Sequence, residues 1–144
     1  MQDTMHRVKI SCFLVIISLV PLCVLTSAPA SYLLPINSDI GPIVEGDATT
    51  IEGYARQALT APYTLEWVEA YIPPSLAQGF VLTYGELLSS ILPVPTLQMG
   101  KAIQRTHLWE VPFAIIEPTY RWGSMVWIDQ DDGRWALLSI SISE

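Results

Sequence analysis

A turn signal between two strand-like stretches constrains the fold of this chain most strongly, and it lies near the C-terminus in WIDQDDGRWALLSISISE. Asp132 and Gly133 are a preferred central pair of a two-residue type I′ hairpin turn, in which both positions need positive φ. On that register Trp127 faces Leu138, and the face that they share becomes apolar away from the tip. A slip of one residue would bury serines and expose isoleucines, so we predict a single register for a hairpin over 124–142.

The same tip holds three carboxylates, those of Asp129, Asp131 and Asp132, which could instead be ligands of a calcium loop. An EF-hand loop needs oxygen ligands at positions 1, 3 and 5, glycine at position 6 and glutamate at position 12. Asp129 and Asp131 match the first two, but Arg134 takes the place of the glycine and Ile140 that of the glutamate. We therefore predict a turn in which Arg134 faces Asp131, with no metal and no other cofactor. Asp129 and Asp131 remain as an alternative metal site.

The chain opens with a segment typical of an export signal. Basic residues within 6–9 precede an uncharged apolar stretch at 10–25, and small residues follow at 28–30. We predict that 1–30 is a secretory signal peptide and that the protein is secreted or periplasmic. The alternative is a membrane-anchored accessory subunit that keeps the segment, although a span needs about 20 apolar residues and Pro21 interrupts this stretch.

Both cysteines of the chain, Cys12 and Cys23, lie in the segment that we expect to be removed. The remaining residues, 31–144, would contain no disulfide, no thiolate metal site and no cysteine nucleophile. They carry five basic residues and thirteen acidic ones, a net charge of −8. Nucleic acids and anionic membranes are poor partners for such a chain, because binding to phosphates relies on clustered Lys and Arg.

We predict one α+β domain over 47–144, with two short helices packed on a small antiparallel sheet that ends in the hairpin. An extended lead-in at 31–46, rich in proline and glycine, is expected to add no regular element. Apolar positions at 64–72 fit either a helix or a strand. Strands are favoured at 80–84 and at 97–116, the second of them interrupted at its single proline.

The two predicted helices both begin at a capping box, in which a threonine hydroxyl binds a backbone amide and a glutamate three residues later reaches back. One box starts at Thr49 with Glu52, and proline at 62 ends the helix that follows. The other starts at Thr83 with Glu86 and leads into a short helix that ends before Pro93.

His107 is the only histidine of 31–144, so any histidine-dependent catalysis must use it. A small secreted hydrolase would hold a serine or threonine against this ring, with Glu110 or Glu117 to orient it. Glu110 would point to the opposite face of a strand from His107. An ordinary histidine at or near the surface is therefore the expectation, and the hydrolase is the alternative.

Tryptophan is the residue type in clear excess, with Trp67, Trp109, Trp122, Trp127 and Trp135 all lying after the leader. The hairpin register places Trp127 in the core. Tyr120, Trp122 and Trp135 are the better candidates for an exposed aromatic surface, which could stack on sugar rings or anchor a protein partner. We therefore predict a non-catalytic binding or interaction module for a protein or carbohydrate ligand.

Overall fold

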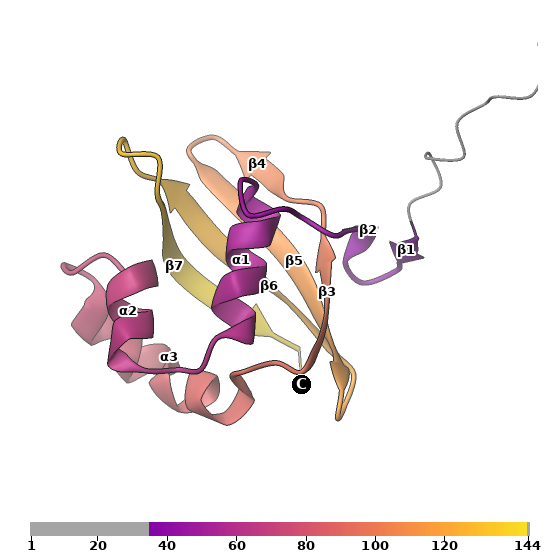
Figure 1. Cartoon of the computed structure of the whole chain (residues 1–144), viewed down its shortest axis with the longest axis horizontal. Helices are drawn as coiled ribbons and strands as arrows, with labels where there is room; N and C mark the ends of the chain where they lie inside the picture. Colours follow the sequence, from indigo (N-terminus) through magenta and orange to yellow (C-terminus); the bar gives the residue numbers. More distant parts are fainter. Residues whose placement is uncertain (1–34, 144) are drawn as a thin grey trace, which may run out of the picture. The chain divides into compact units, whose positions relative to one another are not determined.

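The computed structural model describes residues 35–143, so the predicted signal peptide lies outside the described residues. It shows an α+β domain of three helices and a seven-stranded antiparallel sheet (Figure 1). The elements in chain order are β1 (Ile36–Asn37), β2 (Gly41–Val44), α1 (Ile51–Thr60), α2 (Leu65–Tyr71), α3 (Ala77–Ile91), β3 (Thr96–Gly100), β4 (Ile103–Arg105), β5 (Leu108–Glu117), β6 (Arg121–Asp129) and β7 (Trp135–Ile142). Within 35–143 no helix is long and apolar enough to cross a membrane.

The strands follow the order β1-β2-β3-β5-β6-β7, and β4 pairs with β5 outside this path. All three helices pack on one face of the sheet, where their buried residues form a single core with Phe113, Met125 and Trp127. Trp67 joins two of these helices, because its indole Nε1 donates to the Ala58 carbonyl at 2.8 Å. One face of the sheet is therefore covered, and we call the opposite one the open face.

Helix α1 begins one residue later than its predicted capping box. Thr50 is the N-cap, and its hydroxyl accepts a hydrogen bond from the Gly53 amide at 3.2 Å. Thr49 instead donates its hydroxyl to Asp47. The Glu52 carboxylate accepts a hydrogen bond from the Ala102 amide at 2.9 Å. It therefore links α1 to the segment after β3 instead of completing a capping box.

The number of helices was predicted wrongly. The ambiguous stretch at 64–72 forms α2, capped by Thr64, whose hydroxyl accepts from a backbone amide. The stretch at 80–84, predicted as a strand, lies inside the single helix α3. Thr83 does not cap a new helix, because its hydroxyl donates to the Gly79 carbonyl one turn earlier.

The lead-in and the proline of β5 also differ from expectation. Residues 36–44 form β1 and β2, and β2 pairs with β3, with Ile43 opposite Gly100. Pro112 does not interrupt β5, where it lies opposite Ser124 of β6. β3 pairs with the part of β5 from Phe113 onward, and β4 pairs with the part of β5 up to Glu110. Pro112 therefore lies opposite the gap between β3 and β4. A proline costs no ladder hydrogen bond at such a place.

The hairpin between β6 and β7 is present, but its loop has three residues rather than two. Gln130 donates its amide to the Arg134 carbonyl at 2.7 Å, which leaves residues 131–133 in the loop. Gly133 alone has positive φ there, at 78°, whereas a type I′ turn needs two such residues. The Arg134 guanidinium consequently pairs with Asp132 and not with Asp131.

The longer loop changes the pairing near the tip. Trp127 lies opposite Leu137, which is fully buried, and not opposite the half-buried Leu138. An irregularity in the ladder then restores the register, so that Met125 lies opposite Ile140. Trp127 is fully buried, as predicted, because the shift affects β7 and leaves β6 in place.

Candidate binding site

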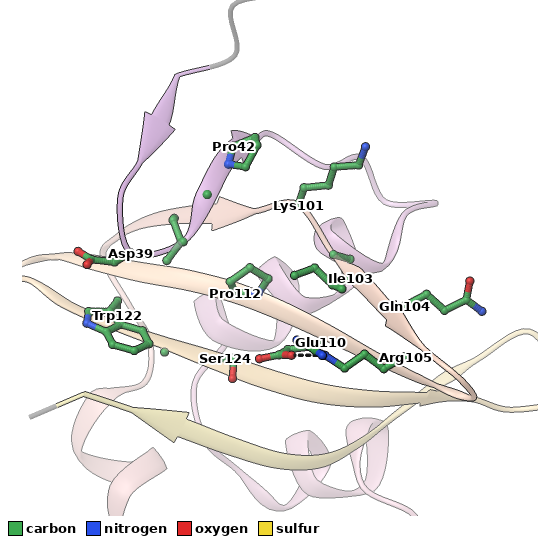
Figure 2. Close-up of a pocket in the computed structure, with 14 residues that line it drawn as sticks. Asp39, Pro42, Lys101, Ile103, Gln104, Arg105, Glu110, Pro112, Trp122 and Ser124 are labelled. Atoms are coloured by element: carbon green, nitrogen blue, oxygen red, sulfur yellow. Dashed lines mark hydrogen bonds and ion pairs between the residues drawn. The ribbon is translucent and has the colours of Figure 1, made fainter.

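A hollow of about 650 Å³ opens on the open face of the sheet, where β3 and β4 leave their gap beside β5 (Figure 2). Pro112 and Ser124 lie in its middle. The turn between β1 and β2 borders one end, together with Trp122, and β4 borders the other. Segments that are far apart in the chain thus meet around one concave surface.

Close backbone packing brings the β1–β2 turn over this face. A Cβ atom on Gly100 would lie 2.3 Å from the Ile40 carbonyl oxygen and 2.7 Å from Cγ of Pro112. Only glycine allows this approach without a shift of the backbone. Ile40 is 4% exposed as a result, and it lines the hollow.

A polar contact fastens the same turn to the start of β6. The Tyr120 hydroxyl donates to Oδ2 of Asp39 at 2.6 Å and also lies 3.0 Å from Oδ1 of Asn37. The backbone amide of Asp39 donates to the same Asn37 oxygen at 3.0 Å. The hydrogen bond to the Asp39 carboxylate raises the pKa of Tyr120, which favours the protonated phenol that donates this bond.

Trp122 is the most exposed tryptophan of the described residues, with 45% of its surface accessible. Both backbone polar groups of Trp122 are hydrogen-bonded to Ser143. The Ser143 amide donates to the Trp122 carbonyl at 2.7 Å, and the Trp122 amide donates to Ser143 Oγ at 3.0 Å. Its neighbour across the strands, Ala114, is fully buried. A fixed strand therefore presents a large aromatic side chain to solvent at the rim of the hollow.

The opposite end of the hollow carries charge. Arg105 pairs with Glu110 at 2.9 Å, and both side chains are partly exposed. Lys101 lies along the upper rim, next to the gap between the strands (Figure 2). The hollow thus has one end with an aromatic ring and a carboxylate, a middle formed by a proline and a serine, and another end with a paired arginine.

The structure brings together two of the three predicted binding residues. Tyr120 and Trp122 lie two positions apart at the Asp39 end of the hollow, and they are 44% and 45% exposed. Trp135 lies elsewhere, half-buried against Trp109 with ring centroids 5.7 Å apart. No local sequence pattern indicates Asp39, since it contacts Tyr120 across 81 positions.

The candidate catalytic residues do not converge. His107 is exposed in the turn between β4 and β5. Glu110 is paired with Arg105, and Glu117 accepts from the Thr96 hydroxyl at 3.1 Å. No hydrogen bond joins His107 to either glutamate within 35–143. The hydrolase remains a prediction without geometric support.

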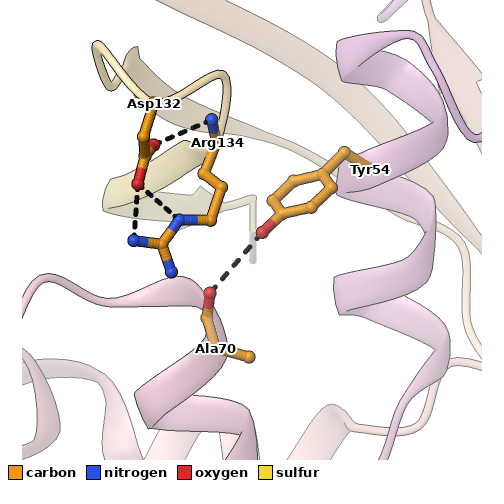
Figure 3. A network of polar contacts seen from close by, with 4 residues as sticks. All are labelled: Tyr54, Ala70, Asp132 and Arg134. Atoms are coloured by element: carbon orange, nitrogen blue, oxygen red, sulfur yellow. Dashed lines mark hydrogen bonds and ion pairs between the residues drawn. The ribbon is translucent and has the colours of Figure 1, made fainter.

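The aspartates of the hairpin tip do not form a metal site within the described residues. Asp129 and Asp131 are exposed, and among the described residues no three His, Cys, Asp or Glu side chains are grouped so as to hold a metal ion. Asp132 lies against Arg134 near the Tyr54 hydroxyl, which is 3.5 Å from the Ala70 carbonyl (Figure 3). The hydrogen bond from Arg134 lowers the pKa of Asp132.

Comparisons with protein-family models, with curated proteins and with solved structures each gave no match to this chain.

Proposed function

We propose that this protein is an exported, non-catalytic binding module that holds its ligand in the hollow on the open face. The observation that carries the proposal is Trp122, a large aromatic residue that is 45% exposed at the rim of a concave surface. Ligand sites are commonly concave and mostly apolar, with a few fixed polar groups. Aromatic residues at such sites contribute much contact area with little loss of side-chain freedom.

Calorimetric titration of the purified chain with pools of peptides and of glycans tests the binding part. Calorimetry is preferable to fluorescence, because replacing Trp122 would remove part of the fluorescent signal itself. We expect saturable heat with one pool, lost in Trp122→Ala and kept in Leu82→Ala. Leu82 is a suitable control since it is 81% exposed on α3, which packs on the covered face. Equal binding by both variants would exclude the hollow as the site.

The export part is tested separately, by mass spectrometry of the native N-terminus. A chain that starts at Ser31 in the secreted or periplasmic fraction is the expected result. A chain that keeps residues 1–30 and sediments with membranes would support the anchored accessory subunit instead. Either result leaves the calorimetric test of the hollow unaffected.

A further inference from the structure

We infer that the ligand of the hollow is an extended peptide, which places a lysine or arginine side chain against Trp122 and Asp39. The inference rests on the proposed function, since it names the chemistry of a ligand for the same hollow. Three features support it: a fixed carboxylate, two exposed aromatic rings and the open edge of β4.

The Asp39 carboxylate is positioned by the protein but retains an available oxygen. Oδ2 accepts the Tyr120 hydroxyl at 2.6 Å, which fixes the orientation of the side chain. Within 35–143 no hydrogen bond or ion pair involves Oδ1 of Asp39. A carboxylate oxygen that is already oriented can accept a charge-assisted hydrogen bond from an ammonium or guanidinium group.

No cationic side chain of the described residues neutralises Asp39. The ion pairs of 35–143 join Arg105 to Glu110 and Arg134 to Asp132. Arg121 follows Tyr120 in the chain but lines a different, smaller hollow. The whole chain carries a net charge of −7, and such a field raises the local concentration of cationic ligands. Lys101 lines the same hollow but forms no ion pair within 35–143, so the Asp39 carboxylate is open to a cation of the ligand.

Two aromatic side chains lie at the same end. Tyr120 and Trp122 are 44% and 45% exposed, and Trp122 lines the same hollow as Asp39. A Lys or Arg group over an aromatic face is attracted by the negative potential of the ring, and tryptophan attracts it most among the aromatic residues. Ring and carboxylate together favour a cation over a neutral group of the same shape.

The open edge of β4 favours a peptide over a sugar as the carrier of that cation. β4 pairs only with β5, so the backbone groups on its other edge have no strand partner within the described sheet. Residues 103–105 of this strand line the hollow. An extended peptide can add to such an edge through main-chain hydrogen bonds, which repeat at the spacing of the strand.

The test uses a blocked alanine pentapeptide with a central lysine, and a twin that carries Nε-acetyl-lysine there. We expect the lysine peptide to bind at least about tenfold more tightly than its twin, because acetylation removes the positive charge and two of the three N–H donors. Asp39→Asn should weaken binding of the lysine peptide by about tenfold, since asparagine keeps the acceptor but loses the charge. Asp129→Asn is the matched control, an exposed carboxylate outside the hollow, and should bind like the wild type.

The outcomes separate this inference from the proposed function. If both peptides bind equally and Asp39→Asn has no effect, the inference of a cationic ligand group is wrong. A loss of binding in Trp122→Ala would still support the hollow as a binding site. If oligomers of deacetylated chitin bind and the lysine peptide does not, the inference that the ligand is a peptide is wrong. Unfolding of Asp39→Asn in urea, compared with the wild type, shows whether any loss of binding reflects a loss of fold.

Discussion

Trp127 and Trp122 belong to the same strand, β6, but one faces the helices and the other faces the open side of the sheet. Their exposed fractions are 0% and 45%. Strand side chains alternate between faces, so two tryptophans an odd number of positions apart must separate in this way. Chemically identical side chains therefore have different roles, and position on the strand decides which.

The two faces also differ in polarity. The buried residues of the described chain include no charged residue, and the core on the covered face is hydrophobic apart from a few polar atoms such as the indole Nε1 of Trp67 and of Trp127. The open face instead has Asp39, Glu110 and Ser124 among the residues that line the hollow. The difference indicates that the covered face supplies most of the stability, whereas the exposed side chains of the open face can change at little cost to the fold.

Trp127→Ala should give the largest effect on stability. Removing a fully buried tryptophan is expected to lower the free energy of unfolding by about 3–5 kcal/mol, because burial is lost and a cavity is left. Trp122→Ala should cost less than about 1 kcal/mol, as for most exposed sites. Urea unfolding followed by circular dichroism measures both. Similar losses of unfolding free energy for the two variants would show that the two faces do not differ in their contribution to stability.

Gly100→Ala should give the next largest effect, because it acts where the β1–β2 turn crosses the open face. The new Cβ would lie 2.3 Å from the Ile40 carbonyl, so the turn must shift, at about 1–3 kcal/mol. Gly79→Ala is the matched control in α3, where nothing lies within 4 Å of an added Cβ. It should stabilise the protein by roughly 0.4–1 kcal/mol. A neutral Gly100→Ala would mean that the turn is not held against β3.

Much of the covered face could be predicted from the sequence, and the open face could not. The apolar spacing of α1 and the alternation around Trp127 each depend on residues close in the chain. The hollow depends on where β3 and β4 stop beside Pro112, and on Asp39 meeting Tyr120 across 81 positions. No local pattern contains that information.

The errors of prediction have similar causes. α3 was divided because Thr83 and Glu86 have capping-box spacing, yet the helix is already formed there and the hydroxyl bonds to the preceding turn. The Asp-Gly pair predicts a two-residue hairpin loop, but it suits a three-residue loop with a single positive φ at Gly133 equally well. Only the tertiary pairing distinguishes these options.

Tyr120→Phe should have a smaller effect, confined to the open face. It removes the hydroxyl that binds Asp39 and Asn37 but keeps the ring. We expect amide hydrogen exchange of residues 36–44 to accelerate by a few-fold, since local opening of that segment becomes easier. Exchange of the amides of β5 and β6 that lie over the core should not change. Acceleration throughout the sheet would show that the contact supports the whole fold.

The smallest expected effect is an acid response of the hairpin tip, which lies on neither face of the central sheet. The hydrogen bond from Arg134 lowers the pKa of Asp132 below its ordinary value of 3.8. A lowered folded-state pKa means that the stabilisation is complete above the ordinary value and is lost as the pH falls through the lowered one. The pair is exposed, so this contribution is small.

The measurement for the tip is an NMR titration of the Gly133 and Gln130 amides from pH 6 to pH 2. The two amides should shift below about pH 4, and the shift of Gly133 should be smaller in Asp132→Asn. The Trp127 indole resonance serves as the internal control, because its surroundings hold no buried charge to titrate. If Trp127 shifts in step with the tip, then the covered face is coupled to surface charge, and the division between a stabilising face and a variable one does not hold.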